Sequence, residues 1–72
     1  MKIHPTAIIS EKSKIDNSVE VGPFCIIDED VEIKKGTKLL SHVVLRGPTF
    51  IGEDNIFYQF STIGEDTPDK KF

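Results

Sequence analysis

Large apolar residues recur at every sixth position along almost the whole chain. The eleven positions are Ile3, Ile9, Ile15, Val21, Ile27, Ile33, Leu39, Leu45, Ile51, Phe57 and Ile63. A period of six matches neither the roughly 3.6 residues per turn of an α-helix nor the roughly 3.5 of a coiled coil. The spacing therefore excludes a helical fold and favours short strands, each of which turns one large side chain inward.

A second periodic position lies four residues after each large one, and it is small or β-branched in ten of eleven cases. Its residues are Ala7, Ser13, Val19, Cys25, Val31, Thr37, Val43, Thr49, Asn55, Ser61 and Thr67. We expect these side chains to pack into corners where bulk cannot fit. Five glycines and four prolines lie among the strands and mark the turns between them.

Three strands at this spacing make a triangular coil of three times six, or 18, residues, so residues 18 apart should stack in one inward column. The predicted columns are Ile3, Val21, Leu39 and Phe57; Ile9, Ile27, Leu45 and Ile63; and Ile15, Ile33 and Ile51. The sequence thus predicts an all-β fold, a parallel β-helix of hexapeptide repeats with about four coils, as one domain over residues 1–72.

The repeat ends near the C-terminus of the sequence. One further step of six after Ile63 reaches Asp69, a carboxylate where an apolar residue belongs, inside a charged stretch from Gly64 to Phe72 that contains Pro68. Because a sequence tends to break its own pattern at functional sites, this stretch is a candidate site. The alternative is an ordinary loop.

Several stretches carry a family resemblance. They are Ile3-His4-Pro5-Thr6-Ala7-Ile8-Ile9, Val21-Gly22-Pro23-Phe24-Cys25-Ile26, Ser41-His42-Val43-Val44-Leu45, Ile51-Gly52-Glu53-Asp54-Asn55-Ile56-Phe57-Tyr58-Gln59-Phe60 and Ser61-Thr62-Ile63-Gly64-Glu65. Together with the charged ending, they resemble the first coils of the UDP-N-acetylglucosamine acyltransferases. The resemblance implies a left-handed coil, against the usual right-handed rule for parallel crossovers. It also implies transfer of a 3-hydroxyacyl chain from acyl carrier protein to the 3-hydroxyl of UDP-N-acetylglucosamine, the first step of lipid A biosynthesis.

The resemblance also implies roles for two residues of the ending. Asp69 falls where the family has an aspartate that contacts the sugar, and Lys71 where it has a lysine near the nucleotide phosphates. A carboxylate can accept hydrogen bonds from sugar hydroxyls, and an ammonium group can offset pyrophosphate charge. Lys70, where the family more often has leucine, and Phe72, where tyrosine is frequent, depart from the pattern without removing either group.

No catalytic residue is assigned within the sequence. The family reaction needs a histidine general base, which the resemblance places several coils beyond Phe72, and neither His4 nor His42 maps onto it; both are expected to be structural. The chain would then be the N-terminal part of an enzyme, with the later coils and a helical domain absent, and would be inactive alone. The resemblance further implies a homotrimer for the parent protein, acyl carrier protein and UDP-N-acetylglucosamine as partners, and no cofactor.

The net charge, the single cysteine and the lack of a long apolar stretch exclude or disfavour several kinds of protein. The net charge of −3 argues against nucleic acid as the main partner, and the cluster of Lys34, Lys35 and Lys38 is expected to be a solvated corner or a contact for an acidic protein. Cys25 is the only cysteine, so neither an intrachain disulfide nor a thiolate metal cluster can form. Without a signal-like N-terminus or a long aliphatic stretch, the chain is expected to be cytoplasmic and not inserted in a membrane.

Other functions stay open at this point. A related hexapeptide acyltransferase, such as the one that N-acylates the glucosamine intermediate of the same pathway, is disfavoured by the ending around Asp69. A γ-class carbonic anhydrase needs three histidine ligands for zinc, and the chain has two histidines. A non-catalytic β-helical remnant or assembly module is the alternative from a different functional class.

Overall fold

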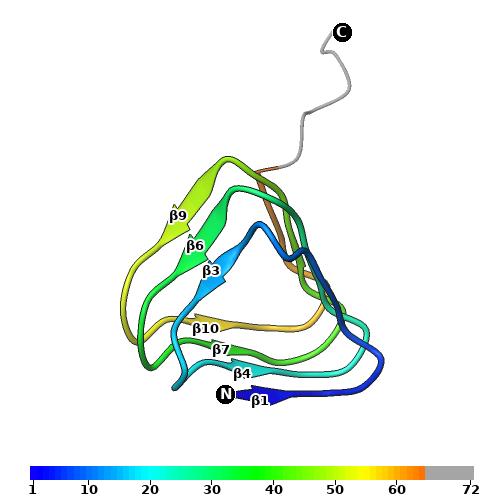
Figure 1. Cartoon of the computed structure of the whole chain (residues 1–72). Coiled ribbons are helices and arrows are strands. Elements are labelled where there is room, and N and C mark those ends of the chain that lie inside the picture. The colour runs from blue at the N-terminus through cyan, green and yellow to red at the C-terminus, as the bar shows by residue number, and fades with distance from the viewer. Residues whose placement is uncertain (65–72) are drawn as a thin grey trace, which may run out of the picture.

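Eleven short parallel strands wind around a triangular axis (Figure 1). The computed structural model describes residues 1–64. The strands are β1 (Lys2–Ile3), β2 (Ile8–Ile9), β3 (Lys14–Ile15), β4 (Glu20–Val21), β5 (Ile26–Ile27), β6 (Val31–Ile33), β7 (Lys38–Leu39), β8 (Val44–Leu45), β9 (Thr49–Ile51), β10 (Ile56–Phe57) and β11 (Thr62–Ile63). Each contains two or three residues and ends in a turn, as the six-residue period predicts.

Strands three apart in the chain lie side by side and form three parallel sheets. Their orders are β1-β4-β7-β10, β2-β5-β8-β11 and β3-β6-β9, so three complete coils are followed by two strands of a fourth. The register pairs Ile3 with Val21 and Val21 with Leu39, an offset of one full coil each time. The chain winds left-handed, counter-clockwise in Figure 1 from the N-terminal coil into the picture. The predicted parallel β-helix is therefore confirmed.

The core is the stack of inward columns. Its buried apolar residues are Val19, Val21, Cys25, Ile27, Val31, Ile33, Leu39, Val43, Leu45 and Ile51. The small corner positions of the middle coils are completely enclosed: Val19, Cys25, Thr37 and Val43 are each 0% exposed. The end coils bury less, because each coil is covered only by its neighbours, and Ile3 is 43% and Ile63 38% exposed.

The corners require unusual backbone conformations. Gly36 and Gly64 have positive φ, but so do Phe24, Asp30, His42, Asp54 and Phe60, with φ between 53° and 65°. Phe24, His42 and Phe60 occupy the same corner of successive coils, and their rings stack with centroids 5.1 and 5.0 Å apart. Because Asp30 and Asp54 adopt the same φ and carry no ring, the conformation belongs to the corner position rather than to the ring contact.

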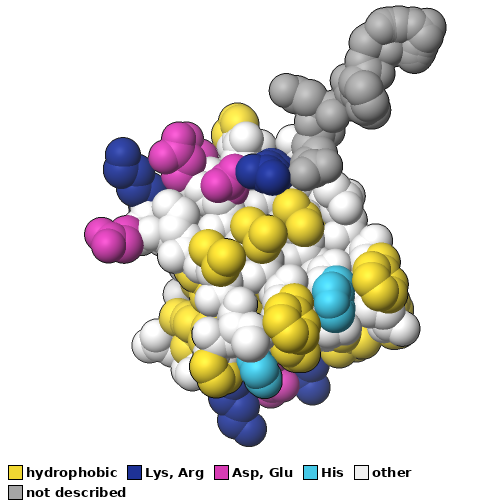
Figure 2. Space-filling model, turned by 90° about the vertical axis from the view of Figure 1, so that its right-hand side faces the viewer, with side chains coloured by type: hydrophobic (Ala, Val, Ile, Leu, Met, Phe, Trp, Pro, Cys, Tyr) yellow, Lys and Arg dark blue, Asp and Glu magenta, His cyan; other side chains and the backbone are white. Residues whose placement is uncertain are grey.

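The three outer faces of the triangle differ in chemistry. Lys2, Glu20 and Lys38 follow one another across the first sheet, and Lys14, Glu32 and Phe50 across the third. The second sheet presents Ile8, Ile26, Val44 and Thr62, none of them charged. Figure 2 shows this face as a row of hydrophobic side chains. One face of the coil is therefore uncharged and mainly apolar.

Candidate functional site

The two residues predicted to bind substrate, Asp69 and Lys71, lie outside the described residues. The last described residue, Gly64, directly follows β11. The corner of the coil at Gly64 is therefore the described part of the chain that is nearest to them in the sequence. We call Asp28, Arg46, Thr49 and Gly64 the exit corner. Asp28, Arg46 and Gly64 each follow a strand of the second sheet by one residue, in successive coils.

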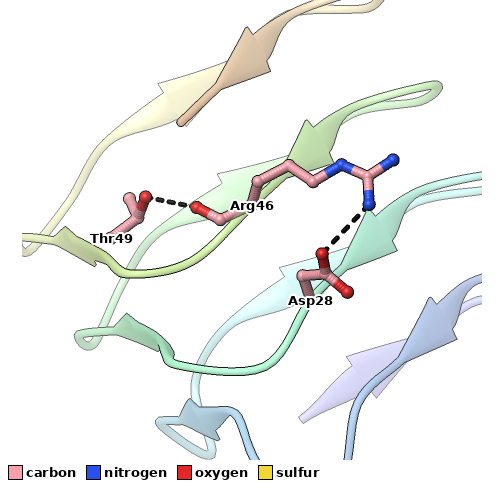
Figure 3. Close-up of polar contacts among 3 residues, drawn as sticks. All are labelled: Asp28, Arg46 and Thr49. Carbon is pink, nitrogen blue, oxygen red and sulfur yellow. Dashed lines mark hydrogen bonds and ion pairs between the residues drawn. The ribbon is translucent and has the colours of Figure 1, made fainter. Parts of the chain in front are cut away.

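Arg46 is the centre of the exit corner (Figure 3). Its Nη1 lies 3.0 Å from Oδ2 of Asp28 in the preceding coil, and the two side chains are 44% and 42% exposed. The carbonyl oxygen of Arg46 accepts a hydrogen bond from the Thr49 hydroxyl. Its backbone N–H donates to the carbonyl of Ile63 in the following coil, at 2.9 Å. Arg46 thus links three successive coils.

Gly64 lies directly against this residue. Its φ is 81°, and a Cβ added there would collide with the carbonyl oxygen of Arg46 and come within 2.6 Å of Oγ1 of Thr49. Only glycine avoids both the positive φ and the collision. Asp28, Arg46 and Thr49 are not among the site residues predicted from the sequence, although Asp28 and Arg46 carry opposite charges at the same position of successive coils.

Both histidines belong to the turns rather than to a catalytic arrangement. Nδ1 of His4 lies 2.9 Å from Oγ1 of Thr6 and accepts the Thr6 N–H at 3.2 Å. His42 stacks between two phenylalanine rings at its corner. These contacts fit the predicted structural roles. Within residues 1–64, no group of three or more His, Cys, Asp and Glu residues could hold a metal ion.

The lysine cluster is part of a mixed-charge surface. Lys34 forms an ion pair with Glu32, at 2.9 Å, and its ammonium lies 5.7 Å from the centroid of the Phe50 ring. The pairing with Glu32 raises the pKa of Lys34. Lys38 pairs in register with Glu20 on the first sheet. Lys34, Lys35 and Lys38 are all exposed, as the interpretation of this cluster as a solvated corner expects.

Two surface carboxylates, Asp16 and Glu32, have a lowered pKa in the folded state. Hydrogen bonds from the Ser18 hydroxyl and N–H lower the pKa of Asp16 from its ordinary value, and the hydrogen bond and charge of Lys34 lower the pKa of Glu32. A carboxyl whose pKa is depressed in the folded state stabilises the fold above its unfolded pKa, and this stabilisation is lost as the pH falls through the folded pKa.

We therefore expect the free energy of unfolding to decrease as the pH falls below about 4, and Asp16→Asn to reduce this slope. Urea titrations followed by circular dichroism between pH 2 and 7 would measure it. The matched control is Glu11→Gln, which removes one negative charge from an exposed residue. An identical acid slope in wild type and Asp16→Asn would contradict the assignment to Asp16.

The sequence and the fold are both similar to known acyltransferases. No family model matches the chain. It is 54% identical over 70 residues to acyl-[acyl-carrier-protein]–UDP-N-acetylglucosamine O-acyltransferase of Saccharophagus degradans, and 48% identical over 71 residues to that of a Psychrobacter species. These matches cover 97% and 99% of the chain. The chain spans 27% of the length of each of these curated relatives.

Two solved structures share the coil. UDP-N-acetylglucosamine acyltransferase of Francisella novicida superposes with a TM-score of 0.89 at 38% identity, over 97% of this chain and 25% of that one. UDP-N-acetylglucosamine O-acyltransferase of Moraxella catarrhalis superposes with a TM-score of 0.91 at 44% identity, over 100% of this chain and 28% of that one. Residues 1–64 contain no helix long and apolar enough to cross a membrane.

Proposed function

We propose that this chain, which spans about a quarter of the length of the UDP-N-acetylglucosamine O-acyltransferases to which it is similar, forms the first coils of such an enzyme. The proposed reaction moves a 3-hydroxyacyl group from acyl carrier protein to the 3-hydroxyl of UDP-N-acetylglucosamine, at the start of lipid A biosynthesis. The observation that carries the proposal is 54% identity across 97% of the chain, together with a TM-score of 0.91 over its full length.

Within that enzyme, the chain would supply substrate-binding groups and the scaffold that holds them. In our proposal, Asp69 accepts hydrogen bonds from the sugar hydroxyls, and Lys71 offsets the charge of the pyrophosphate. By resemblance to the family, we assign the general base to a histidine of the later coils, and the contacts of His4 and His42 with their own turns are compatible with structural roles. The 72 residues alone are then expected to bind UDP-N-acetylglucosamine without transferring an acyl chain to it.

We further propose that the complete enzyme is a cytoplasmic homotrimer. The association of subunits, though not their number or the compartment, is supported by the uncharged face of the second sheet, where Ile8 is 66% exposed, and by Phe24 and Phe60 at the adjoining corner, which are 55% and 76% exposed. Contiguous apolar surface of this kind is typical of protein–protein contacts.

Replacing Asp69 by alanine tests the proposed binding role. We expect the dissociation constant for UDP-N-acetylglucosamine to rise at least about tenfold, because a hydrogen bond to a charged group is worth roughly 1.5–3 kcal/mol. Isothermal titration of the full chain would measure it. Asp66→Ala removes the same charge from the same stretch and is expected to have little effect. Equal affinity of wild type and Asp69→Ala would remove Asp69 from the mechanism.

A further inference from the structure

The first coil meets the second through side-chain hydroxyl groups at two corners. At the corner that follows β1 and β4, the N–H of Phe24 donates to Oγ1 of Thr6, one coil earlier, at 2.8 Å. At the corner that follows β3 and β6, the N–H of Gly36 donates to Oγ of Ser18, also one coil earlier, at 2.9 Å. Phe24 and Gly36 both have positive φ. Each hydroxyl therefore supplies the acceptor for a backbone N–H that the left-handed conformation of the corner turns toward the preceding coil.

Each hydroxyl is held in turn by a side chain two residues before it. Oδ2 of Asp16 accepts the Ser18 hydroxyl at 2.6 Å and the Ser18 N–H at 2.9 Å. Nδ1 of His4 lies 2.9 Å from Oγ1 of Thr6 and accepts the Thr6 N–H at 3.2 Å. Because a backbone N–H can only donate, Nδ1 is the ring nitrogen without a proton, and the Thr6 hydroxyl donates to it as well. We call these two chains of hydrogen bonds the Asp16 relay and the His4 relay.

The same two corners are built differently one coil further on. There the equivalent N–H groups belong to His42 and Asp54, and they donate to the backbone carbonyls of Pro23 and Lys35, each at 3.0 Å. No side chain takes part in either of these hydrogen bonds. The relays are therefore a feature of the contact between the first and second coils.

The acceptors of the two relays respond differently to mild acid. Histidine side chains in general take up a proton between about pH 5 and 8, and both ring nitrogens are then donors. A proton on Nδ1 of His4 would face the N–H of Thr6, whose nitrogen is 3.2 Å away, so the ring would have to leave this position. The hydrogen bonds from Ser18 lower the pKa of Asp16, with smaller contributions from the charges of Lys35 and Lys34, so this carboxylate stays ionised over the same range.

The charged groups around His4 are of both signs. Its ring shares a surface depression of about 500 Å³ with Lys2, Glu20 and Lys38, from β1, β4 and β7. The amino group of Met1 lies three residues away in the sequence. These groups do not take part in the His4 relay, so a variant of His4 separates its proton from theirs.

We propose that the His4 relay is a pH-sensitive contact between the first two coils: proton uptake by His4 opens it at the Phe24 corner, while the Asp16 relay stays closed. The inference does not depend on the proposed function. Phe24 is 55% exposed and its ring lies 5.1 Å from that of His42, so the relay holds one end of an exposed row of aromatic rings. Mild acid should therefore loosen this corner without unfolding the coil.

Backbone amide hydrogen exchange of the full chain, followed by NMR at about pH 8 and about pH 5 and corrected for the intrinsic pH dependence of exchange, tests the proposal. We expect the protection factor of Thr6 to fall about three- to tenfold on acidification, because its N–H loses an acceptor. That of Phe24 should fall about two- to threefold, because a hydroxyl that no longer donates is a weaker acceptor. Ser18 and Gly36, in the Asp16 relay, should not change and are the internal control.

His4→Asn is the decisive variant, since its amide oxygen can replace Nδ1 as the acceptor and takes up no proton in this range. We expect the exchange of Thr6 to become independent of pH in His4→Asn. Glu20→Gln removes the carboxylate from the same depression and should retain the behaviour of wild type. Constant protection of Thr6 in wild type, an equal loss at Ser18 and Gly36, or the same loss at Thr6 in His4→Asn as in wild type would each overturn the inference.

Discussion

An Ile27→Ala variant should lose about 4 kcal/mol of unfolding free energy, because the substitution empties a fully enclosed part of the core. Ile27 is 1% exposed and lies between Ile9 and Leu45 in the column of the second sheet. A domain of this size has a total stability of only about 4–11 kcal/mol at typical values per residue. The variant should therefore be close to half unfolded at the low end of that range. Urea denaturation followed by circular dichroism would measure the loss.

The matched control is Ile63→Ala in the same column. Ile63 belongs to the last described coil and is 38% exposed, so the same truncation should cost less than about 1.5 kcal/mol. The comparison separates burial from residue type and column. Equal losses at the two positions would show that the middle coils do not form the continuous core described above.

Gly22→Ala is expected to cost about 3 kcal/mol for a different reason, which is overpacking against the backbone. A Cβ at Gly22 would collide with the carbonyl oxygen of Leu40 in the next coil. That carbonyl cannot easily retreat, because the N–H of Gly22 donates to Leu39 at 2.8 Å and the N–H of Leu40 donates to Phe57 at 3.0 Å. The collision would therefore separate two paired coils.

Gly52→Ala provides the control for the Gly22 variant. Its new methyl group would have space, so we expect no loss of stability and a gain of up to about 1 kcal/mol from the reduced entropy of the unfolded chain. Thermal unfolding of the two variants would compare them directly. A Gly22→Ala variant as stable as Gly52→Ala would contradict the close approach of the second and third coils.

The fold could be predicted in detail because large apolar residues at a spacing of six determine it. The period of six places Ile27 and Leu45 in one column, and the register observed between their strands is the predicted one. The fully enclosed Cys25 and Val43 likewise follow from the second periodic position. Handedness could not be derived this way, because a six-residue period is compatible with either hand; the family resemblance supplied it.

The corners were less predictable than the strands. Glycine is the usual signal for positive φ, yet Phe24, His42 and Phe60 adopt it at one corner of successive coils, where their rings contact one another. The pair of Asp28 and Arg46 depends in the same way on a neighbour in the adjacent coil. Both contacts join residues 18 positions apart, so the predicted coil already placed the partners side by side, but the residue types did not show that their side chains would meet. The roles of Asp69 and Lys71 came from resemblance and stay predictions, since both lie outside the described residues.

The constant offset of one full coil between paired strands has a consequence for how this chain can change in length. Removing or adding one whole coil keeps every later side chain facing the same way. A single inserted residue before β7 would instead move Lys38 into the inward place of Leu39 and reverse the side-chain directions of the strands that follow. Viable changes in length inside the coil should therefore come in multiples of six residues, and only a full turn also keeps each later strand on its own sheet, unless the extra residues bulge outward from a corner.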